Sequence, residues 1–149
     1  MRLRKILSVD IPMHPRGKQR ARSRAGSASH YTPKMTVNNE AHMMMMAAQQ
    51  MAGQEPAQGV VKLDVKIFLS PSAVLRKKII KEPENKMIWY PLKKPDIDNV
   101  QKSVMDSLNG IAWLDDKQVC EVCENKRYTL QAPMTQITAW EIMEGDEDE

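Results

Sequence analysis

The sequence predicts a mixed α/β domain, of the α+β kind, with helices on one face of a small sheet. Residues 61–69 alternate apolar and polar side chains, which is typical of a strand with one buried face. Residues 36–52 and 98–109 repeat apolar side chains every three or four positions, which is typical of helices. The 149 residues fit one domain, which we expect to span residues 1–143, with a disordered acidic tail at residues 144–149.

Proline, glycine and hydrophobic periodicity delimit the other elements. In chain order we expect a strand at 3–11, a long mobile loop at 13–33, the helix at 36–52, the strand at 61–69, an excursion at 71–90 with a short helix after Ser72, the helix at 98–109, and strands near 117–130 and 134–143. The apolar face of the first helix is predicted at Val37, Ala41, Met44, Met45, Ala48 and Met51. In the second helix Val100, Val104 and Leu108 form a ridge, and Asn109-Gly110 supplies a left-handed end.

The composition excludes several classes of protein. With 42% hydrophobic and 28% charged residues, the chain resembles neither a disordered nor a fibrous protein. No stretch approaches the ~20 apolar residues of a membrane span, and the start lacks a secretory signal, so we expect a cytoplasmic protein without a membrane partner. Cys120 and Cys123 form a lone C-x-x-C, which we expect to be two half-buried side chains rather than a zinc site or a disulfide.

Charge is distributed unevenly along the chain. Residues 141–149 carry six acids and no base, so the rest of the chain is strongly basic. The segment from Arg16 to Lys34 contains no acid, and its other basic residues are Lys18, Arg20, Arg22 and Arg24. Basic side chains at alternating positions suit an extended arm that follows phosphates, although a solvated loop has the same composition.

Two carboxylates are predicted to converge at the start of the second helix. Pro95 favours an extended conformation before it, and if this persists to Asp98, then Asp96 and Asp98 project from the same side of the chain. An N-cap would explain Asp98 alone but not Asp96. Two converging carboxylates repel each other unless a cation lies between them, and oxygen-only ligands suit Mg²⁺ or Mn²⁺.

Three further residues near this pair carry charge. Lys102 follows Asp98 by four positions, so it is either an ordinary helical ion pair or an ammonium beside a metal-bound phosphate. Asp115 and Asp116 come after the turn that ends the helix. Because consecutive residues of an extended segment face opposite ways, we expect one of them to join the site and the other to stabilise the turn.

These residues form a recognisable signature. The run K-P-D-I-D-N, Lys102, a helix ending in Asn-Gly and the run W-L-D-D-K-Q-V closely resemble the RusA family of Holliday junction resolvases (crossover junction endodeoxyribonucleases) of bacteria and their prophages. The family's K-x-R-x-R segment after the first strand is matched by Lys18-Gln-Arg20-Ala-Arg22, followed by Tyr31-Thr-Pro. The resemblance covers roughly residues 3–143 in order.

The resemblance implies a homodimer that binds four-way DNA junctions and nicks two opposed strands with Mg²⁺. Position by position, Asp96, Asp98 and Asp116 match the family's essential acids, Lys102 matches its essential lysine, and Asp115 matches a further acid. The residues Lys18, Arg20, Arg22, Arg24 and Lys34 are the expected DNA contacts. The Met-rich helix, the 71–92 excursion and the acidic tail have no counterpart in the family pattern.

Two other functions fit the same residues. One is a DNA-binding module without catalysis, in which Asp98 is a cap and Asp116 part of a turn. The other is an RNA-processing nuclease with similar chemistry. With three Tyr, three Trp and one Phe, the chain has few aromatic side chains for stacking single-stranded bases, so we expect it to bind duplex or junction backbone.

Overall fold

The structure, a computed structural model, describes residues 1–18, 22–23, 30–31 and 34–145, and it confirms a single α+β domain. Its elements are β1 (Arg2–Ile11), β2 (Arg22–Ser23), β3 (His30–Tyr31), α1 (Lys34–Met51), β4 (Val60–Leu69), α2 (Ala73–Lys81), the 3-10 turn η1 (Lys86–Trp89), α3 (Ile97–Leu108), the 3-10 turn η2 (Asp116–Gln118), β5 (Val119–Tyr128) and β6 (Met134–Met143). Apart from the short β2, β3, η1 and η2, these are the elements that the sequence predicts.

The four long strands form one mixed sheet in the order β1-β6-β4-β5. β6 runs antiparallel to both β1 and β4, whereas β5 pairs parallel to β4 and forms one edge of the sheet. The apolar side chains of β4 point to one face and are fully buried: Val61, Leu63, Val65, Ile67 and Leu69. Because paired residues point to the same side of a sheet, the β4–β5 register also defines the two faces of β5.

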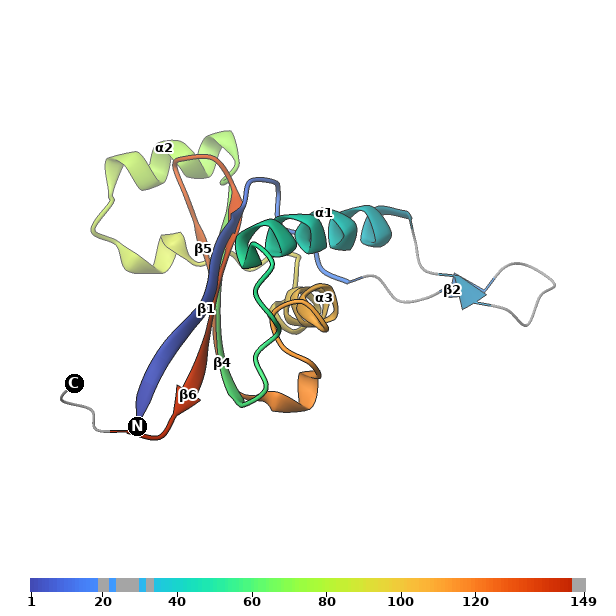
Figure 1. Cartoon of the computed structure of the whole chain (residues 1–149). Helices are drawn as coiled ribbons and strands as arrows, with labels where there is room; N and C mark the ends of the chain where they lie inside the picture. Colours follow the sequence, from blue (N-terminus) through green and yellow to red (C-terminus); the bar gives the residue numbers. More distant parts are fainter. Residues whose placement is uncertain (19–21, 24–29, 32–33, 146–149) are drawn as a thin grey trace.

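The helices α1 and α3 cover the apolar face of this sheet, as Figure 1 shows on the right of the strands. The predicted ridge of α3 is confirmed, since Val100, Val104 and Leu108 are buried. In the same view α2 and η1 extend from the end of the sheet toward its other side.

The predicted apolar face of α1 is wrong except at its end. The buried residues are Asn39, Met43, Ala47 and Met51, whereas Val37, Met44 and Met45 are exposed. Four consecutive methionines make neighbouring faces of this helix about equally apolar, so periodicity does not select between them. The buried Asn39 Nδ2 donates a hydrogen bond to Ser103 Oγ of α3 at 3.4 Å, which aligns the two helices.

The 71–90 excursion contains the expected short helix, because the Ser72 hydroxyl accepts from Leu75 N at the start of α2. Contrary to the prediction, this segment contributes to the core, since Ile79 is fully buried. Its far end is held by Trp89, whose Nε1 donates to Pro83 O at 3.0 Å.

Both cysteines are free, as predicted, but they are exposed rather than half-buried, because β5 lies at the edge of the sheet.

Within the described residues, no helix combines the length and apolar character needed to cross a membrane. The predictions for Arg20, Arg24 and most of the acidic tail fall on residues outside the described ranges.

Candidate active site

Asp96 and Asp98 lie on either side of the first residue of α3. The helix begins at Ile97, so the chain between the two acids is not extended and the argument that they share a strand side does not apply. Asp96 rather than Asp98 occupies the N-cap position, and its side chain makes no capping hydrogen bond. Both acids are exposed, and their carboxylates make no hydrogen bond or ion pair with described residues. Capping therefore explains neither carboxylate.

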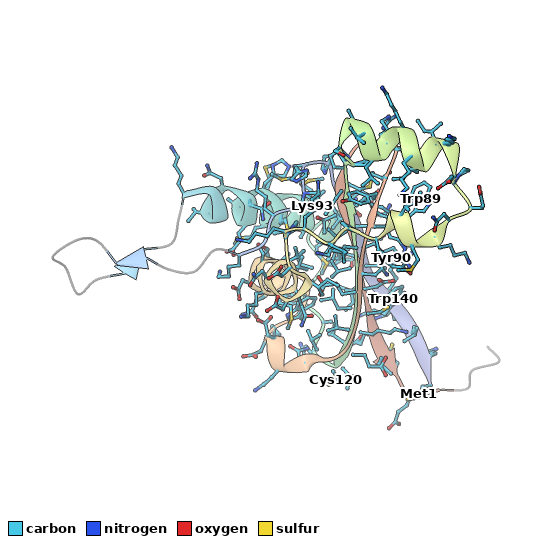
Figure 2. The ribbon with its side chains drawn as sticks, turned by 180° about the vertical axis from the view of Figure 1, so that it is seen from behind. Met1, Trp89, Tyr90, Lys93, Cys120 and Trp140 are labelled. Carbon is cyan, nitrogen blue, oxygen red and sulfur yellow. The ribbon has the colours of Figure 1, made fainter. Side chains whose placement is uncertain are left out.

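The segment that leads into Asp96 is anchored to the edge strand. Lys126 Nζ donates to the backbone oxygens of Lys93, at 2.7 Å, and of Pro95, at 3.1 Å. Lys93 itself lies between η1 and α3 (Figure 2), where its ammonium is 5.5 Å from the centre of the Tyr128 ring and donates to Ser70 O. The start of α3 is thus fixed to β5 through backbone carbonyls.

Asp115 and Asp116 have different partners. Asp115 caps η2: its Oδ1 accepts from Lys117 N at 2.9 Å, and Gln118 Oε1 accepts from the Asp115 backbone N–H at 2.8 Å. Asp116 Oδ1 accepts from the indole Nε1 of Trp113, a fully buried residue, at 2.8 Å. Asp115 therefore stabilises the turn, as predicted for one of the two acids, and Trp113 fixes Asp116 in one orientation.

Lys102 lies in α3, four residues after Asp98, with its side chain exposed. Its ammonium makes no ion pair with any described residue. The ordinary helical Asp98–Lys102 pair is therefore absent, and the ammonium is open to a ligand.

Glu124 is an acid that the sequence analysis did not single out. It pairs with Val65 in the parallel β4–β5 register, so it lies on the face of β5 that α3 covers. Both of its carboxylate oxygens are buried and have no hydrogen-bond partner among the described residues. Burial, and then the negative charge of Asp98, raise the pKa of Glu124 to about 7. The charge of Asp98 thus acts on Glu124.

The carboxylates of this region are the kind of ligand that a hard divalent cation prefers, but they are not arranged around a common point. In the described part of the chain, no three His, Cys, Asp or Glu side chains are placed to hold a metal ion together. Asp96, Asp98 and Asp116 are therefore not brought together as one ligand set. The unpartnered carboxylate oxygens of Glu124, on which the charge of Asp98 acts, are nevertheless donors of the kind that Mg²⁺ and Mn²⁺ prefer.

Lys18, a basic residue close to α3, is already paired with acidic side chains. Lys18 Nζ lies 2.8 Å from Glu40 Oε1 of α1 and 2.7 Å from Asp106 Oδ2 of α3, so its charge is already balanced. Although burial acts to lower the pKa of Lys18, hydrogen bonds to Asp106 and Glu40 leave it raised. Lys18 is thus placed as an anchor between two helices.

A cavity of about 620 Å³ opens between the end of β1 and α1. Its lining residues are Met13, Arg16, Lys34, Asn38, Asn39 and His42. Nearby, burial and the positive charges of Arg16 and Lys93 lower the pKa of His14. This concentration of positive charge lies on the same helix-covered side as α3 and suits phosphate groups.

Three residues of this region were missed from the sequence: Trp113, Glu124 and Lys126. A signal for two of them was present, because Glu124 and Lys126 have the same parity in their strand as the apolar Val122 and Tyr128. Charged side chains on the apolar face of a strand need a specific partner or ligand. The spacing of Trp113 and Asp116 carries no comparable signal.

The comparison with known families decides the assignment. The family model described as "Endodeoxyribonuclease RusA" matches residues 12–139. The chain belongs to the RusA endodeoxyribonuclease family.

RusA-family proteins are Holliday junction resolvases, so this member is an endodeoxyribonuclease with junction DNA as its substrate class. A curated relative is similar over most of both chains: it is 29% identical over 127 residues, which cover 85% of this chain and 88% of the relative. That relative is "Uncharacterized protein YqaN" of Bacillus subtilis (strain 168). The RusA match includes α3, η2 and most of the sheet, and so all the acids described above.

Proposed function

We propose that this protein resolves four-way DNA junctions as a Mg²⁺-dependent homodimer, by paired nicks in opposed strands. The observation that carries the proposal is the pair of exposed acids at the N-terminus of α3, Asp96 and Asp98, which neither cap the helix nor form ion pairs with described residues. A DNA-binding module without catalysis would not need two exposed acids that have no partner among the described residues.

Asp96 and Asp98 would hold the metal ion, which can be Mg²⁺ or Mn²⁺. Asp116 is proposed as a third ligand on the family resemblance, since the described side chains are not assembled around one point. When bound, the ion supplies Lewis-acid activation of water and neutralises phosphate oxygens. The positive end of α3 favours the negative charge gathered there. Trp113 would hold Asp116 in a single orientation, and Lys126 would keep the entry to α3 in place.

Lys102 would act on the DNA rather than on the protein. Its ammonium is exposed and unpaired among described residues, so it can approach a phosphate at the start of α3 and stabilise charge that develops during cleavage. Lys34 at the cavity, together with Arg20, Arg22 and Arg24 of the basic arm, would bind the DNA backbone. Lys18 would contribute mainly by fixing the base of that arm.

The test uses a labelled four-way junction, a linear duplex and an RNA junction of the same sequence, each with Mg²⁺ or with EDTA. We expect Mg²⁺-dependent cleavage of the DNA junction in opposed strands. Asp96→Asn and Asp98→Asn should each lower the cleavage rate by roughly 100-fold or more, while junction binding is retained because the acids do not hold DNA. Asp10→Asn, which removes an exposed charge from β1, is the matched control and should cleave normally.

Near-normal turnover in both α3 variants at saturating Mg²⁺ would remove the basis of the carboxylate site. Junction binding without cleavage by the wild-type protein would favour the non-catalytic module, and preferential cleavage of the RNA junction would favour the RNA-processing nuclease.

A further inference from the structure

The least satisfied polar group in the described part of the chain is the Glu124 carboxylate. Each of its two oxygens is inaccessible to solvent and neither has a hydrogen-bond partner. Buried polar side-chain atoms almost always have a partner, because an unpaired one loses its hydration without compensation. A carboxylate with both oxygens in this condition therefore requires an explanation.

The position of Glu124 points to the start of α3. Residues two apart in a strand share a face, so Glu124 lies on the same side of β5 as Lys126. Lys126 reaches the carbonyls of Lys93 and Pro95, directly before Asp96, and α3 packs against β5. Glu124 is thus on the strand face beneath the helix end that carries Asp98, and the charge of Asp98 acts on it.

No described cation neutralises Glu124. Lys126 is the next residue on its strand face, but its ammonium donates to two backbone carbonyls and forms no ion pair with Glu124. The negative charge of Asp98 therefore acts on Glu124, and no described ion pair offsets it. Such an arrangement is stable only if Glu124 takes up a proton or if a cation binds from solution.

Asp64 provides a contrast. It also has one buried oxygen without a partner, but it pairs with Cys123 and with Thr138, on the opposite face of the sheet from Val65 and Glu124. It cannot reach the start of α3. The pairing of an unsatisfied carboxylate with Asp98 is specific to Glu124.

We propose that Glu124 is a further ligand of the divalent cation bound at Asp98, joining the edge strand β5 to the start of α3; two carboxylates with water and DNA phosphate are enough to hold Mg²⁺. This inference rests on the proposed function, because it extends the same metal site. It also explains why Glu124 is buried without a partner: the cation that compensates it is supplied by the solution.

The test compares Glu124→Gln with the wild-type protein at pH 8. Calorimetry measures the affinity for Mn²⁺, and thermal unfolding in EDTA and in Mn²⁺ measures the change in Tm that the ion causes. The control is Glu121→Gln, which removes an exposed charge from the other face of the same strand. We expect Glu124→Gln to weaken Mn²⁺ binding about tenfold or more and to lose most of the Mn²⁺-induced rise in Tm. In EDTA its Tm should equal or exceed that of the wild type, because a repulsive buried charge is gone; this shows that the variant folds. Glu121→Gln should behave as wild type.

Asp98→Asn separates the inference from the proposed function. If Asp98→Asn loses Mn²⁺ binding while Glu124→Gln keeps wild-type affinity and a wild-type Mn²⁺ shift, Glu124 is not a ligand and the α3 site stands. If the wild-type protein binds no Mn²⁺, or if Asp98→Asn binds it normally, the metal site of the proposed function fails, and the inference fails with it.

Discussion

Trp113 and Asp116 form a pair in which a buried indole N–H sets the direction of an acid. An asparagine at position 116 keeps an oxygen that can accept the Trp113 hydrogen bond, so Asp116→Asn removes charge without disturbing the contact. Asparagine is also as good an N-cap as aspartate, so Asp115→Asn should keep the cap of η2. We expect Asp116→Asn to abolish junction cleavage and Asp115→Asn to stay within a few-fold of wild type.

The measurement is the single-turnover cleavage rate of a four-way junction, with Tm recorded for both variants. Similar Tm values would show that the difference in rate is chemical. Equal losses of activity in the two variants would contradict the separate roles of the neighbouring acids.

Replacing Lys102 should separate an effect on the cleavage rate from an effect on the stability of the fold. Its side chain is exposed and makes no ion pair with a described residue, so Lys102→Ala should change the free energy of unfolding by at most a few tenths of a kcal/mol. Cleavage should nevertheless be lost, because the role proposed for the ammonium is toward bound DNA. Lys77→Ala, at an exposed lysine of α2, should change neither quantity. A fall in Tm together with activity would make Lys102 a structural residue.

The sequence indicates a candidate site residue when the signal is local. Asp96, Asp98, Lys102 and the two acids after Trp113 are recognisable from spacing, and the structure adds which acid caps η2. Glu124 could not be placed by spacing alone, because its position under α3 depends on the parallel register between strands that are more than fifty residues apart in the chain.

At the scale of elements, the base of the basic arm is attached to both helices that cover the sheet. Lys18 bridges Glu40 of α1 and Asp106 of α3, and its backbone N–H donates to Asn99 O at 3.0 Å. Gly17 lies so close to α3 that an added Cβ would be 2.8 Å from the Asn99 Cβ. The arm therefore leaves the domain from a fixed point beside Asp98.

This attachment predicts different effects for neighbouring basic residues. Lys18→Ala should destabilise the fold by about 1 kcal/mol, or roughly 2–4 °C in Tm, because two partly exposed ion pairs are lost. Replacing Arg20 and Arg22 by alanine should leave Tm unchanged but weaken junction binding and lower the slope of log K against log salt, because fewer counterions are released. Fluorescence anisotropy over a range of salt concentrations measures this slope.

A normal Tm for Lys18→Ala would show that the bridge does not hold the arm. An unchanged salt slope in the Arg20 and Arg22 double variant would show that the arm does not contact phosphate.

Where a strand or helix has one clear hydrophobic period, its first and last residues were predicted to within one or two positions, as for β4 and α3. Two kinds of feature were not. The buried face of α1 could not be chosen because its methionines leave several faces apolar, and the pairing of β2 with β3 involves only two residues in each strand. The order β1-β6-β4-β5 depends on long-range pairing that no local pattern encodes.

At the scale of the whole molecule, one 17.0 kDa chain carries one pair of acids at α3. A four-way junction has approximate two-fold symmetry and needs two nicks, so we expect a two-fold homodimer. Sedimentation at micromolar concentration should give about twice the chain mass. On a supercoiled cruciform plasmid, linear product should appear with little nicked circle. A stable monomer that yields mainly nicked circles would mean that the enzyme nicks without paired resolution.

The pairing of Arg2 with Met143 places the start of β1 beside the end of β6. Lys126 lies at the other end of the sheet, in line with Ile67, Thr135 and Ile11, and Figure 2 shows Met1 far from Lys93. The backbone can therefore be closed into a ring by a short glycine-serine peptide after Glu149 and reopened at the exposed turn at Gly53. We expect this circular permutant to unfold cooperatively and to cleave junctions at a rate near that of the original chain, because the new connection lies at the opposite end of the sheet from the entry to α3, where Asp96 and Asp98 lie.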